Sequence, residues 1–446
     1  MGLKYIEQIK SVVLFVLVLL SITLTFSIWT YRPNYDTERT KAVNILVAKK
    51  AQLVEVIKPY RMVFHEDGIW RGTDRSKEMK GIISQMQNWQ VTNPTLVSSN
   101  VDHTKMNQLI AGNERYTLFF SSEIPYSIFQ NFLATTESKV EDISFNQMIV
   151  AWDQLSTSGE MTVFFANTSE KKLYKAKVHV KSKSVFEKQI ARLSNDLEEY
   201  SVFTREKGAS LYLPTEASKM IQSAYIVDKV SIDRFKNALF DNPNVVKNSF
   251  DDVTSEENFT DGVSMMRVNN NKRVLNYVNT TASDNHERLE KSKLIMNTFD
   301  YINKHGGWTG DFRYDSLDYE NNKVIYQLYM EDYPVYADLL DTSTQLVTVW
   351  GDNRIAVYVR PFYKLVPSLE NTTLTIMSGQ EVINRLMKLK TVNIKDIKEI
   401  RPGYLLTKSG QNAFIFKPAW FYLVDGKWSP LQTTPVVGGG DQVGLE

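Results

Sequence analysis

The sequence predicts an α+β protein in which one N-terminal membrane helix precedes a multidomain body of antiparallel sheets with packed helices. Residues 11–29 form an apolar run without a single charge, and the rest of the chain has ordinary globular composition. Apolar residues make up 43% and aromatic residues 12% of the 446, which is more than disordered chains contain. Within the body, some runs alternate apolar and polar residues with period two, as strands do, and turn residues separate them. Between them lie runs whose apolar residues recur at helical spacing. The length of the chain indicates more than one domain.

The apolar run 11–29 has the length of a membrane span. At about 1.5 Å of rise per residue it extends roughly 28 Å, close to the thickness of the hydrocarbon layer. A cleaved signal peptide is the alternative, but such peptides have a shorter apolar region followed by a site of small residues. Here the run ends in Phe26, Ile28 and Trp29, followed by Tyr31, which is typical of an interfacial aromatic belt. We therefore expect the helix to be retained.

The orientation of this helix does not follow from its flanking charges, because Lys4 and Lys10 precede it and Arg32, Arg39 and Lys41 follow it. A short tail inside and a long domain outside is the usual arrangement for an N-terminal membrane helix. We expect a cytoplasmic tail at 1–10, a stalk at 30–44 and an extracytoplasmic body, in a single-pass protein of the cell membrane.

Four small hydroxyl residues give this helix a candidate interaction face. Ser21 and Thr25 share one side of the helix, as do Thr23 and Ser27. In a membrane, such residues permit close helix approach and interhelical hydrogen bonds. They can equally bond to their own backbone. The sequence leaves both interpretations open.

The segment 45–205 is predicted to be an N-terminal α/β domain. Apolar residues at helical spacing predict helices at 79–86, 106–110 and 186–197. β-rich runs predict strands at 54–64, 116–120, 145–152 and 161–165, with a turn at 156–159.

The segment 206–300 is predicted to be a middle domain. Ser231 is placed to cap a helix at 232–239, and strands are expected at 262–268 and 273–277. A longer helix is expected to begin near Asp284, with Glu287 completing a capping box, and to end at Gly306 and Gly307.

The segment 301–446 is predicted to be a β-rich C-terminal domain. Strands are expected at 324–330, 335–340, 346–350, 355–359, 397–406, 413–416 and 420–424. Glu331–Asp332 and Gly351–Asn353 are the predicted turns. Ser378 and Glu381 predict a capping box that opens one further helix.

Composition argues against several classes of function. Once Lys4, Lys10 and Glu7 are set aside, the chain holds 50 residues of each sign, without the basic excess typical of nucleic-acid binding. There is no cysteine, so thiolate chemistry and disulfides are excluded. No zinc-hydrolase, nucleophile-elbow or phosphate-loop motif occurs. We expect no catalytic residue, no metal, no cofactor, no nucleic-acid partner and no small-molecule substrate identifiable from the sequence. The five histidines are His65, His103, His179, His286 and His305.

Two local patterns admit a functional and a structural interpretation. Asp311, Asp315, Asp318 and Glu320 could be calcium ligands or paired glycosidase carboxylates, but the alternation along residues 311–315 favours a solvated strand face. The run 305–308, His-Gly-Gly-Trp, could line a pocket, but a left-handed cap at the end of a helix is the favoured interpretation.

The whole chain resembles the YycH (WalH) proteins of Gram-positive bacteria. No single motif is diagnostic, whereas the order and spacing of several are fairly specific. Besides the N-terminal apolar run, the segments that carry the resemblance are Ile232–Phe240, Thr298–Gly307, Asp311–Arg313, Tyr333–Pro334, Val347–Gly351 and Pro418–Trp420.

This resemblance implies a membrane-anchored accessory of the WalK (YycG) sensor histidine kinase, which controls cell-wall metabolism with the response regulator WalR (YycF). It implies a second single-pass partner, YycI (WalI), with contacts through membrane helices and outer domains. It also implies that the last part of the body, a helix with a β-meander, is similar to YycI, and that the protein has no enzymatic activity. The rival hypothesis is a membrane-tethered extracytoplasmic enzyme or binder of cell-wall material, for which Asp311, Asp315 and Asp318 would be the candidate carboxylates.

Overall fold

The computed structural model describes residues 13–21, 23–24, 48–92, 94–130, 134–135, 143–205, 208–254, 256–282, 288–337, 341–410 and 412–431. The chain forms two compact units, residues 1–44 and residues 45–446.

The described part of the first unit is helical at residues 13–21 and 23–24. The Thr23 hydroxyl donates to the carbonyl oxygens of Leu19 at 3.0 Å and Leu20 at 2.9 Å, which is the backbone-bonded alternative considered for this residue. Thr25, Ser27 and the predicted tail and stalk lie outside the described residues, so the interaction face stays a prediction. Among the residues that the structure describes, no helix is long and apolar enough to cross a membrane.

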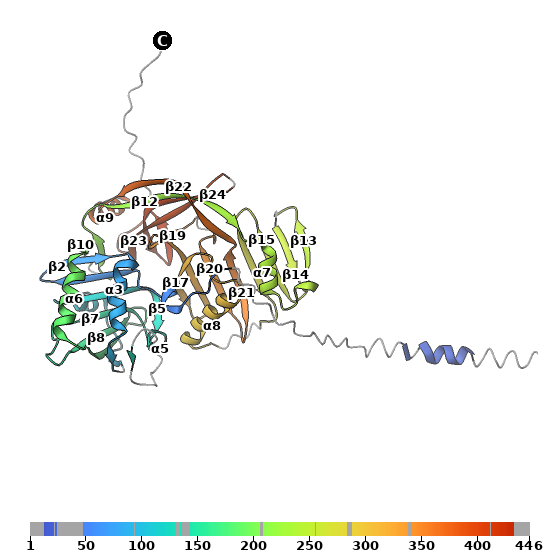
Figure 1. The fold of residues 1–446 in the computed structure, drawn as a ribbon, viewed down its shortest axis with the longest axis horizontal. Coiled ribbons are helices and arrows are strands. Elements are labelled where there is room, and N and C mark those ends of the chain that lie inside the picture. The colour runs from blue at the N-terminus through green and yellow to red at the C-terminus, as the bar shows by residue number, and fades with distance from the viewer. Residues whose placement is uncertain are drawn as a thin grey trace, which may run out of the picture. The chain divides into compact units, whose positions relative to one another are not determined.

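The second unit contains two large sheets (Figure 1). As far as the structure describes it, sheet 1 has eleven strands in the order β11-β10-β2-β1-β5-β7-β8-β9-β3-β6, with β4 beside β9. All its pairings are antiparallel except β3 with β6. Its strands are β1 (Arg61–Glu66), β2 (Ile69–Thr73), β3 (Gln90–Val91), β4 (Thr95–Ser98), β5 (Arg115–Pro125), β6 (Ala134–Thr135), β7 (Ser144–Ala151), β8 (Glu160–Asn167), β9 (Lys172–His179), β10 (Glu198–Phe203) and β11 (Leu211–Pro214).

In the described residues, sheet 2 has fourteen strands in the order β13-β14-β15-β16-β21-β20-β18-β19-β23-β24-β12-β22, with β17 beside β18 and β25 beside β24. Among the pairings of its described residues, β19 with β23 is parallel and the others are antiparallel. Its strands are β12 (Ser218–Lys229), β13 (Lys247–Asp251), β14 (Glu256–Thr260), β15 (Ser264–Asn269), β16 (Val274–Asn279), β17 (Asp311–Asp318), β18 (Lys323–Met330), β19 (Tyr333–Tyr336), β20 (Gln345–Trp350), β21 (Ile355–Pro361), β22 (Tyr363–Ile376), β23 (Glu399–Ser409), β24 (Ala413–Val424) and β25 (Lys427–Pro430).

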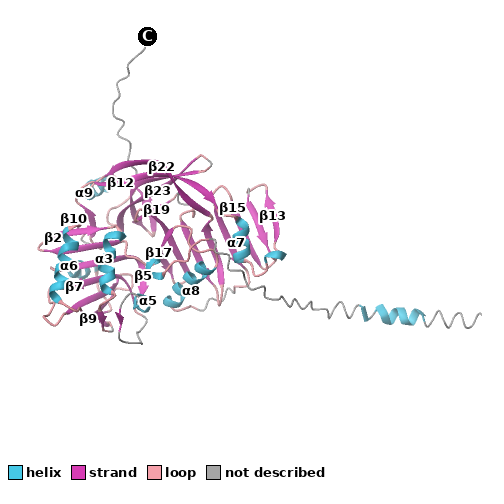
Figure 2. Ribbon diagram, in the orientation of Figure 1, coloured by secondary structure: helices cyan, strands magenta, loops and turns pink. Residues whose placement is uncertain are grey.

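Short helices cover the faces of these sheets (Figure 2). They bury apolar stripes, as Met79, Ile82 and Met86 do on α3 and Val382, Ile383 and Leu386 do on α9. The helices are α2 (Leu53–Val56), α3 (Ser76–Met86), α4 (His103–Ile110), α5 (Tyr126–Phe129), α6 (Lys183–Asn195), α7 (Ile232–Leu239), α8 (Lys291–Lys304) and α9 (Gly379–Lys388), with a 3-10 turn, η2, at Pro243–Val245.

The predicted α+β class with antiparallel sheets and packed helices is confirmed. The capping box of α9 is also confirmed, because the Ser378 hydroxyl accepts from Glu381 N and the Glu381 carboxylate accepts from Ser378 N at 2.8 Å. Ser231 stands at the N-cap of α7, as expected, but its side chain makes no capping hydrogen bond there.

Several predicted boundaries are wrong. Residues 53–56 form α2, and the strand that follows begins only at Arg61. The helix expected from Asp284 begins at Lys291, and both Asp284 and Glu287 lie outside the described residues. The strands expected at 413–416 and 420–424 are one continuous strand, β24.

The domain boundaries at 205 and 300 stay predictions. The strands between residues 61 and 214 belong to sheet 1, and those between 218 and 430 belong to sheet 2. The predicted middle and C-terminal domains both contribute strands to sheet 2, where β16 pairs with β21 and β12 with β22.

Candidate functional site: the junction between the two sheets

The two sheets meet along a junction that three clusters of charged side chains cross. Each cluster is centred on one cation, and we refer to them as the Arg61 cluster, the Arg313 cluster and the Lys291 cluster. Each joins residues of sheet 1 or its helices to residues of sheet 2 or its helices.

The Arg61 cluster is the most buried of the three. Arg61, the first residue of β1, is 1% exposed and donates two hydrogen bonds, of 2.7 and 2.9 Å, to the Asp74 carboxylate. Its third nitrogen donates to Glu399 of β23 at 2.6 Å, and the Tyr60 hydroxyl donates to the other oxygen of Glu399 at 2.7 Å. Burial by itself would lower the pKa of Arg61, but Asp74 and Glu399 outweigh it, so that the arginine stays charged. A guanidinium held by two carboxylates thus links β1 to β23.

The Arg313 cluster links α3 to β17 and to the turn between β18 and β19. Arg313 pairs with Asp311 at 2.6 Å and Asp332 at 2.8 Å, and it also donates to the Ser76 hydroxyl at the start of α3. The second oxygen of Asp332 accepts from Lys77 N at 3.3 Å. Burial alone would raise the pKa of Asp332, but its hydrogen bond and ion pair with Arg313 lower it.

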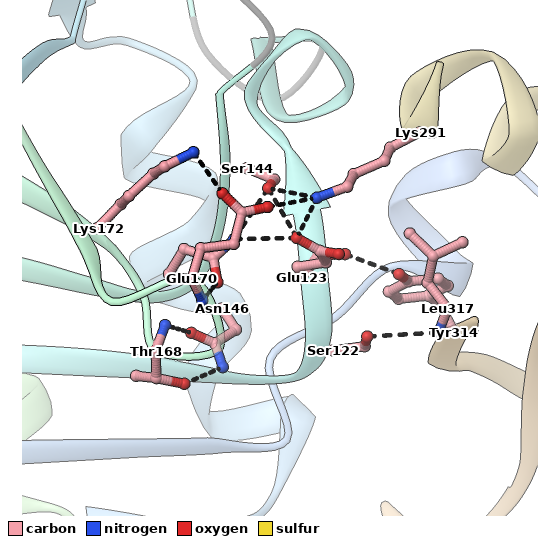
Figure 3. Close-up of polar contacts among 11 residues, drawn as sticks. Ser122, Glu123, Ser144, Asn146, Thr168, Glu170, Lys172, Lys291, Tyr314 and Leu317 are labelled. Atoms are coloured by element: carbon pink, nitrogen blue, oxygen red, sulfur yellow. Dashed lines mark hydrogen bonds and ion pairs between the residues drawn. The ribbon is translucent and has the colours of Figure 1, made fainter. Parts of the chain in front are cut away.

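The Lys291 cluster joins the first turn of α8 to β5 and to the turn after β8 (Figure 3). The Lys291 ammonium pairs with Glu123 at 2.8 Å and with Glu170 at 2.7 Å. Glu123 also accepts from Ser144 at 2.7 Å, and its backbone carbonyl accepts from the Tyr314 hydroxyl of β17 at 2.7 Å. Both carboxylates therefore belong to sheet 1, and the cation that bridges them belongs to the sheet 2 side.

Replacing Lys291 with methionine is expected to flatten the acid dependence of stability. Burial alone would raise the pKa of Glu170, but hydrogen bonds from Lys172 and Lys291 lower it. A carboxylate with a lowered folded-state pKa contributes stability above the unfolded-state pKa of about 4.3, and this stability is lost as the pH falls through the folded-state pKa. Urea midpoints measured between about pH 6 and pH 3.5 should fall less steeply in Lys291→Met than in the unchanged chain.

The control for this measurement is Lys183→Met. Lys183 forms an i,i+4 pair with Glu187 at 3.6 Å in which both side chains are more than 40% exposed. Its removal should leave the slope unchanged. Equal slopes for Lys291→Met and the unchanged chain would contradict the assigned role of Lys291.

A cleft of about 900 Å³ lies within the junction, and its lining includes Tyr60, Asp315, Arg401 and Trp428. The Arg401 guanidinium lies 4.1 Å from the ring centroid of Trp428 and 5.2 Å from that of Tyr60. It pairs with Asp315 at 3.5 Å. Burial raises the pKa of Asp315 in spite of this cation. The described lining of the cleft thus combines aromatic rings with charged side chains of both signs.

The four carboxylates singled out in the sequence do not converge on one site. Asp311 pairs with Arg313, Asp315 with Arg401, and Asp318 accepts from Asn321. The Glu320 side chain is 80% exposed. The prediction of a solvated strand face is right for Asp311 and Asp318, which are exposed on β17, and wrong for Asp315, whose side chain is 14% exposed. Glu320 lies in the turn after the strand. A β-bulge between Tyr314 and Ser316 interrupts the alternation of β17 at this point.

No group of three or more His, Asp or Glu side chains that could hold a metal ion occurs among the described residues. The cations at the centres of the three clusters were not singled out in the sequence. One available signal was Arg61 itself, a charge inside the run Tyr-Arg-Met-Val-Phe. Another was Lys291, a cation in the first turn of a helix, where the dipole disfavours it unless carboxylates compensate.

Two family models match the chain almost end to end. The model described as "YycH protein, N-terminal domain" matches residues 7–195, and "YycH protein, C-terminal domain" matches residues 208–435. The chain belongs to the YycH family. The junction therefore lies between the two YycH domains. One strand is an exception: β11 falls within the C-terminal match but belongs to sheet 1, where it pairs with β10.

Known YycH proteins agree with this assignment. The chain is 25% identical, over 99% of both sequences, to the "Two-component system WalR/WalK regulatory protein YycH" of Bacillus subtilis (strain 168). The crystal structure of YycH from Bacillus subtilis superposes with a TM-score of 0.72 at 21% identity, covering 87% of this chain and 99% of that one. The resemblance inferred from the sequence is thereby confirmed, and the fold is that of the YycH structure.

Proposed function

We propose that this YycH-family protein is a non-enzymatic accessory regulator of the WalK (YycG) sensor histidine kinase, which controls cell-wall metabolism. The observation that carries the proposal is the match over 99% of both chains to a protein named as a WalR/WalK regulatory protein. Both YycH domains are present, so the match is not confined to one shared module.

The proposed location is the cell membrane, with residues 1–10 in the cytoplasm, residues 11–29 spanning the bilayer once and the body outside the cytoplasm. The support is the uncharged run 11–29, whose length suits a bilayer and whose end is aromatic. In this arrangement the protein acts with YycI (WalI) through contacts between membrane helices and between outer domains. The last part of the body, with α9 and the strands around it, is proposed to share its fold with YycI.

The proposed mechanism is lateral packing of helix 11–29 against the membrane helices of the kinase, with Ser21, Thr23, Thr25 and Ser27 as the contact face. A signalling bundle with two states needs only a small bias, because about 1.4 kcal/mol changes the ratio of states tenfold. Hydrogen bonds between membrane helices contribute energies of this order.

The absence of enzymatic activity is part of the proposal. The support is that each candidate carboxylate already has a partner within the protein. Asp311 and Asp315 each form an ion pair with an arginine, and Asp318 accepts a hydrogen bond from Asn321 N in its own turn. The cleft at the junction is the observation that favours the alternative, a membrane-tethered binder of cell-wall material. Retention of the purified full chain on sedimented peptidoglycan would favour that alternative.

Exchange of residues 11–29 for an unrelated membrane-spanning sequence is expected to remove the effect of the protein on WalK. The measurements are autophosphorylation of WalK in membranes that contain the full chain and YycI, and the amount of WalK that co-purifies with the chain. A second variant, in which the four hydroxyl residues become alanine, keeps the span and tests the proposed face. Unchanged kinase activity together with unchanged co-purification after the exchange would refute the membrane part of the mechanism.

A further inference from the structure

Strand β13 leaves one edge of sheet 2 open. It stands at the end of the strand order and, within the described part of the chain, pairs only with β14 (Figure 1). The first four of its five residues are exposed, including Phe250 at 59%. Val245 just before the strand is 53% exposed and Val253 just after it is 94% exposed. Exposed edge strands with apolar side chains are sites where another strand adds.

The sequence of this edge is complementary to itself. The strand reads Lys-Asn-Ser-Phe-Asp from residue 247 to residue 251. In an antiparallel pairing of two copies with Ser249 opposite Ser249, Lys247 of each copy lies opposite Asp251 of the other. Opposite charges directly across a pair of strands stabilise it, and like charges destabilise it.

Other registers lose this match. A shift that places Phe250 opposite Phe250 leaves Lys247 beyond the end of the partner strand, and a shift that places Asn248 opposite Asn248 does the same to Asp251. In a parallel pairing in register, Lys247 would lie opposite Lys247 and Asp251 opposite Asp251. In the register centred on Ser249, the two Phe250 side chains lie on one face as diagonal neighbours, about 7–8 Å apart at Cα and within reach of aromatic rings.

We propose that a second copy of this chain docks on β13, so that the two sheets continue through a two-fold axis at Ser249. The contact is isologous, because the same five residues contribute on both sides. It closes the open edges of both copies at once, which an unrelated strand would do for only one. This inference is independent of the proposed regulatory function.

The chain offers a direct test because it contains no cysteine. In the Ser249→Cys variant of the full chain, the two thiols would lie on opposed residues of an antiparallel pair, with Cα atoms about 4.5–5.5 Å apart, a separation that disulfides accept. Mild oxidation of the membranes should convert most of the chain to a species of twice the monomer mass on a non-reducing gel. Lys188→Cys, on the exposed side of α6, is the control and should stay monomeric.

Charge variants of the same cysteine protein test the register. Lys247→Glu would face Asp251, and Asp251→Lys would face Lys247, so each variant alone should cross-link at least tenfold more slowly. A mixture of the two should restore the rate, because the introduced carboxylate of one copy then faces the introduced ammonium of the other, and the remaining Asp251 faces the remaining Lys247. Asp251 also accepts from Val253 N at 2.9 Å, so circular dichroism must show that Asp251→Lys remains folded.

Cross-linking of Ser249→Cys no faster than that of Lys188→Cys would overturn the proposal. A rate that does not respond to Lys247→Glu would also overturn it, because the complementary register would then be wrong. A cross-linked species of any mass other than twice the monomer would show that a different chain occupies the edge.

Discussion

Replacement of Arg61 by methionine is expected to lower the free energy of unfolding by about 3–5 kcal/mol. The side chain is 1% exposed and its hydrogen bonds satisfy two carboxylates, those of Asp74 and Glu399. Methionine has a similar length but no charge, so it would leave Asp74 buried without a cation. Loss of one partner of a buried ion pair is costly for this reason, even where the intact pair adds little net stability.

The matched control is Arg75→Met. Arg75 pairs with Glu78 at 2.7 Å and with Glu198 at 3.4 Å, but its side chain is 46% exposed. Exposed pairs of this kind contribute about 0–1 kcal/mol. Urea denaturation of the full chain in detergent, followed by fluorescence, should show a large shift of the midpoint for Arg61→Met and a small one for Arg75→Met. Equal shifts of the midpoint in the two variants would mean that the burial of the Arg61 cluster does not determine how much it contributes to stability.

The predictions that succeeded depend on residues close together in the sequence. The capping box at Ser378 and Glu381 spans three residues, and Gly306 and Gly307 adopt the positive φ angles expected at the end of a helix, +111° and +66°. Local hydrogen bonding and backbone preference determine such features, so a sequence pattern is sufficient to predict them.

Short apolar runs do not distinguish helix from strand, and this is why the strand predicted to begin at residue 54 is wrong over residues 54–56, which belong to α2. The strand partners of β22 were also beyond prediction. Its residue Ile376 pairs with Ser218, far earlier in the chain, and the pairing stabilises both strands only after the chain has folded. The register of such pairs depends on tertiary context rather than on local pattern.

The junction could not be predicted for a related reason. Arg61 and Glu399 are 338 residues apart, and Lys291 and Glu123 are 168 residues apart. No spacing rule joins residues across such separations. What the sequence does contain is a charge, Arg61, next to the apolar residues of β1, and a charge in such a place indicates a buried partner. Asp315 carried no such signal, because β17 holds several charged residues.

Replacement of Gly307 by alanine is expected to lower the free energy of unfolding by about 2–5 kcal/mol, from a backbone penalty and a steric one. The φ angle of +66° belongs to the left-handed region, which costs other residues about 1–2 kcal/mol. An added Cβ would also lie 2.6 Å from the carbonyl oxygen of Ala48 and 2.7 Å from that of Lys49. Both are backbone atoms, so relief of the clash requires movement of the chain.

That movement is opposed by the contacts of the 48–51 segment. Trp308 N donates to the Lys49 carbonyl at 3.0 Å, and Ala51 N donates to the Asn303 side chain at 3.0 Å. The same Asn303 oxygen accepts from the Trp308 indole at 2.8 Å. Displacement of residues 48 and 49 would therefore weaken the attachment of this segment to the end of α8.

Gly410→Ala separates the two contributions. Gly410 has nearly the same φ angle, +60°, but nothing lies within 4 Å of the position that a Cβ would occupy. Its replacement should cost only the backbone penalty of about 1–2 kcal/mol. Thermal unfolding of the full chain in detergent should then rank the unchanged chain above Gly410→Ala and Gly410→Ala above Gly307→Ala. If the two variants unfold at the same temperature, the close approach of residues 48 and 49 to Gly307 contributes nothing, and the glycine is required only for its backbone conformation.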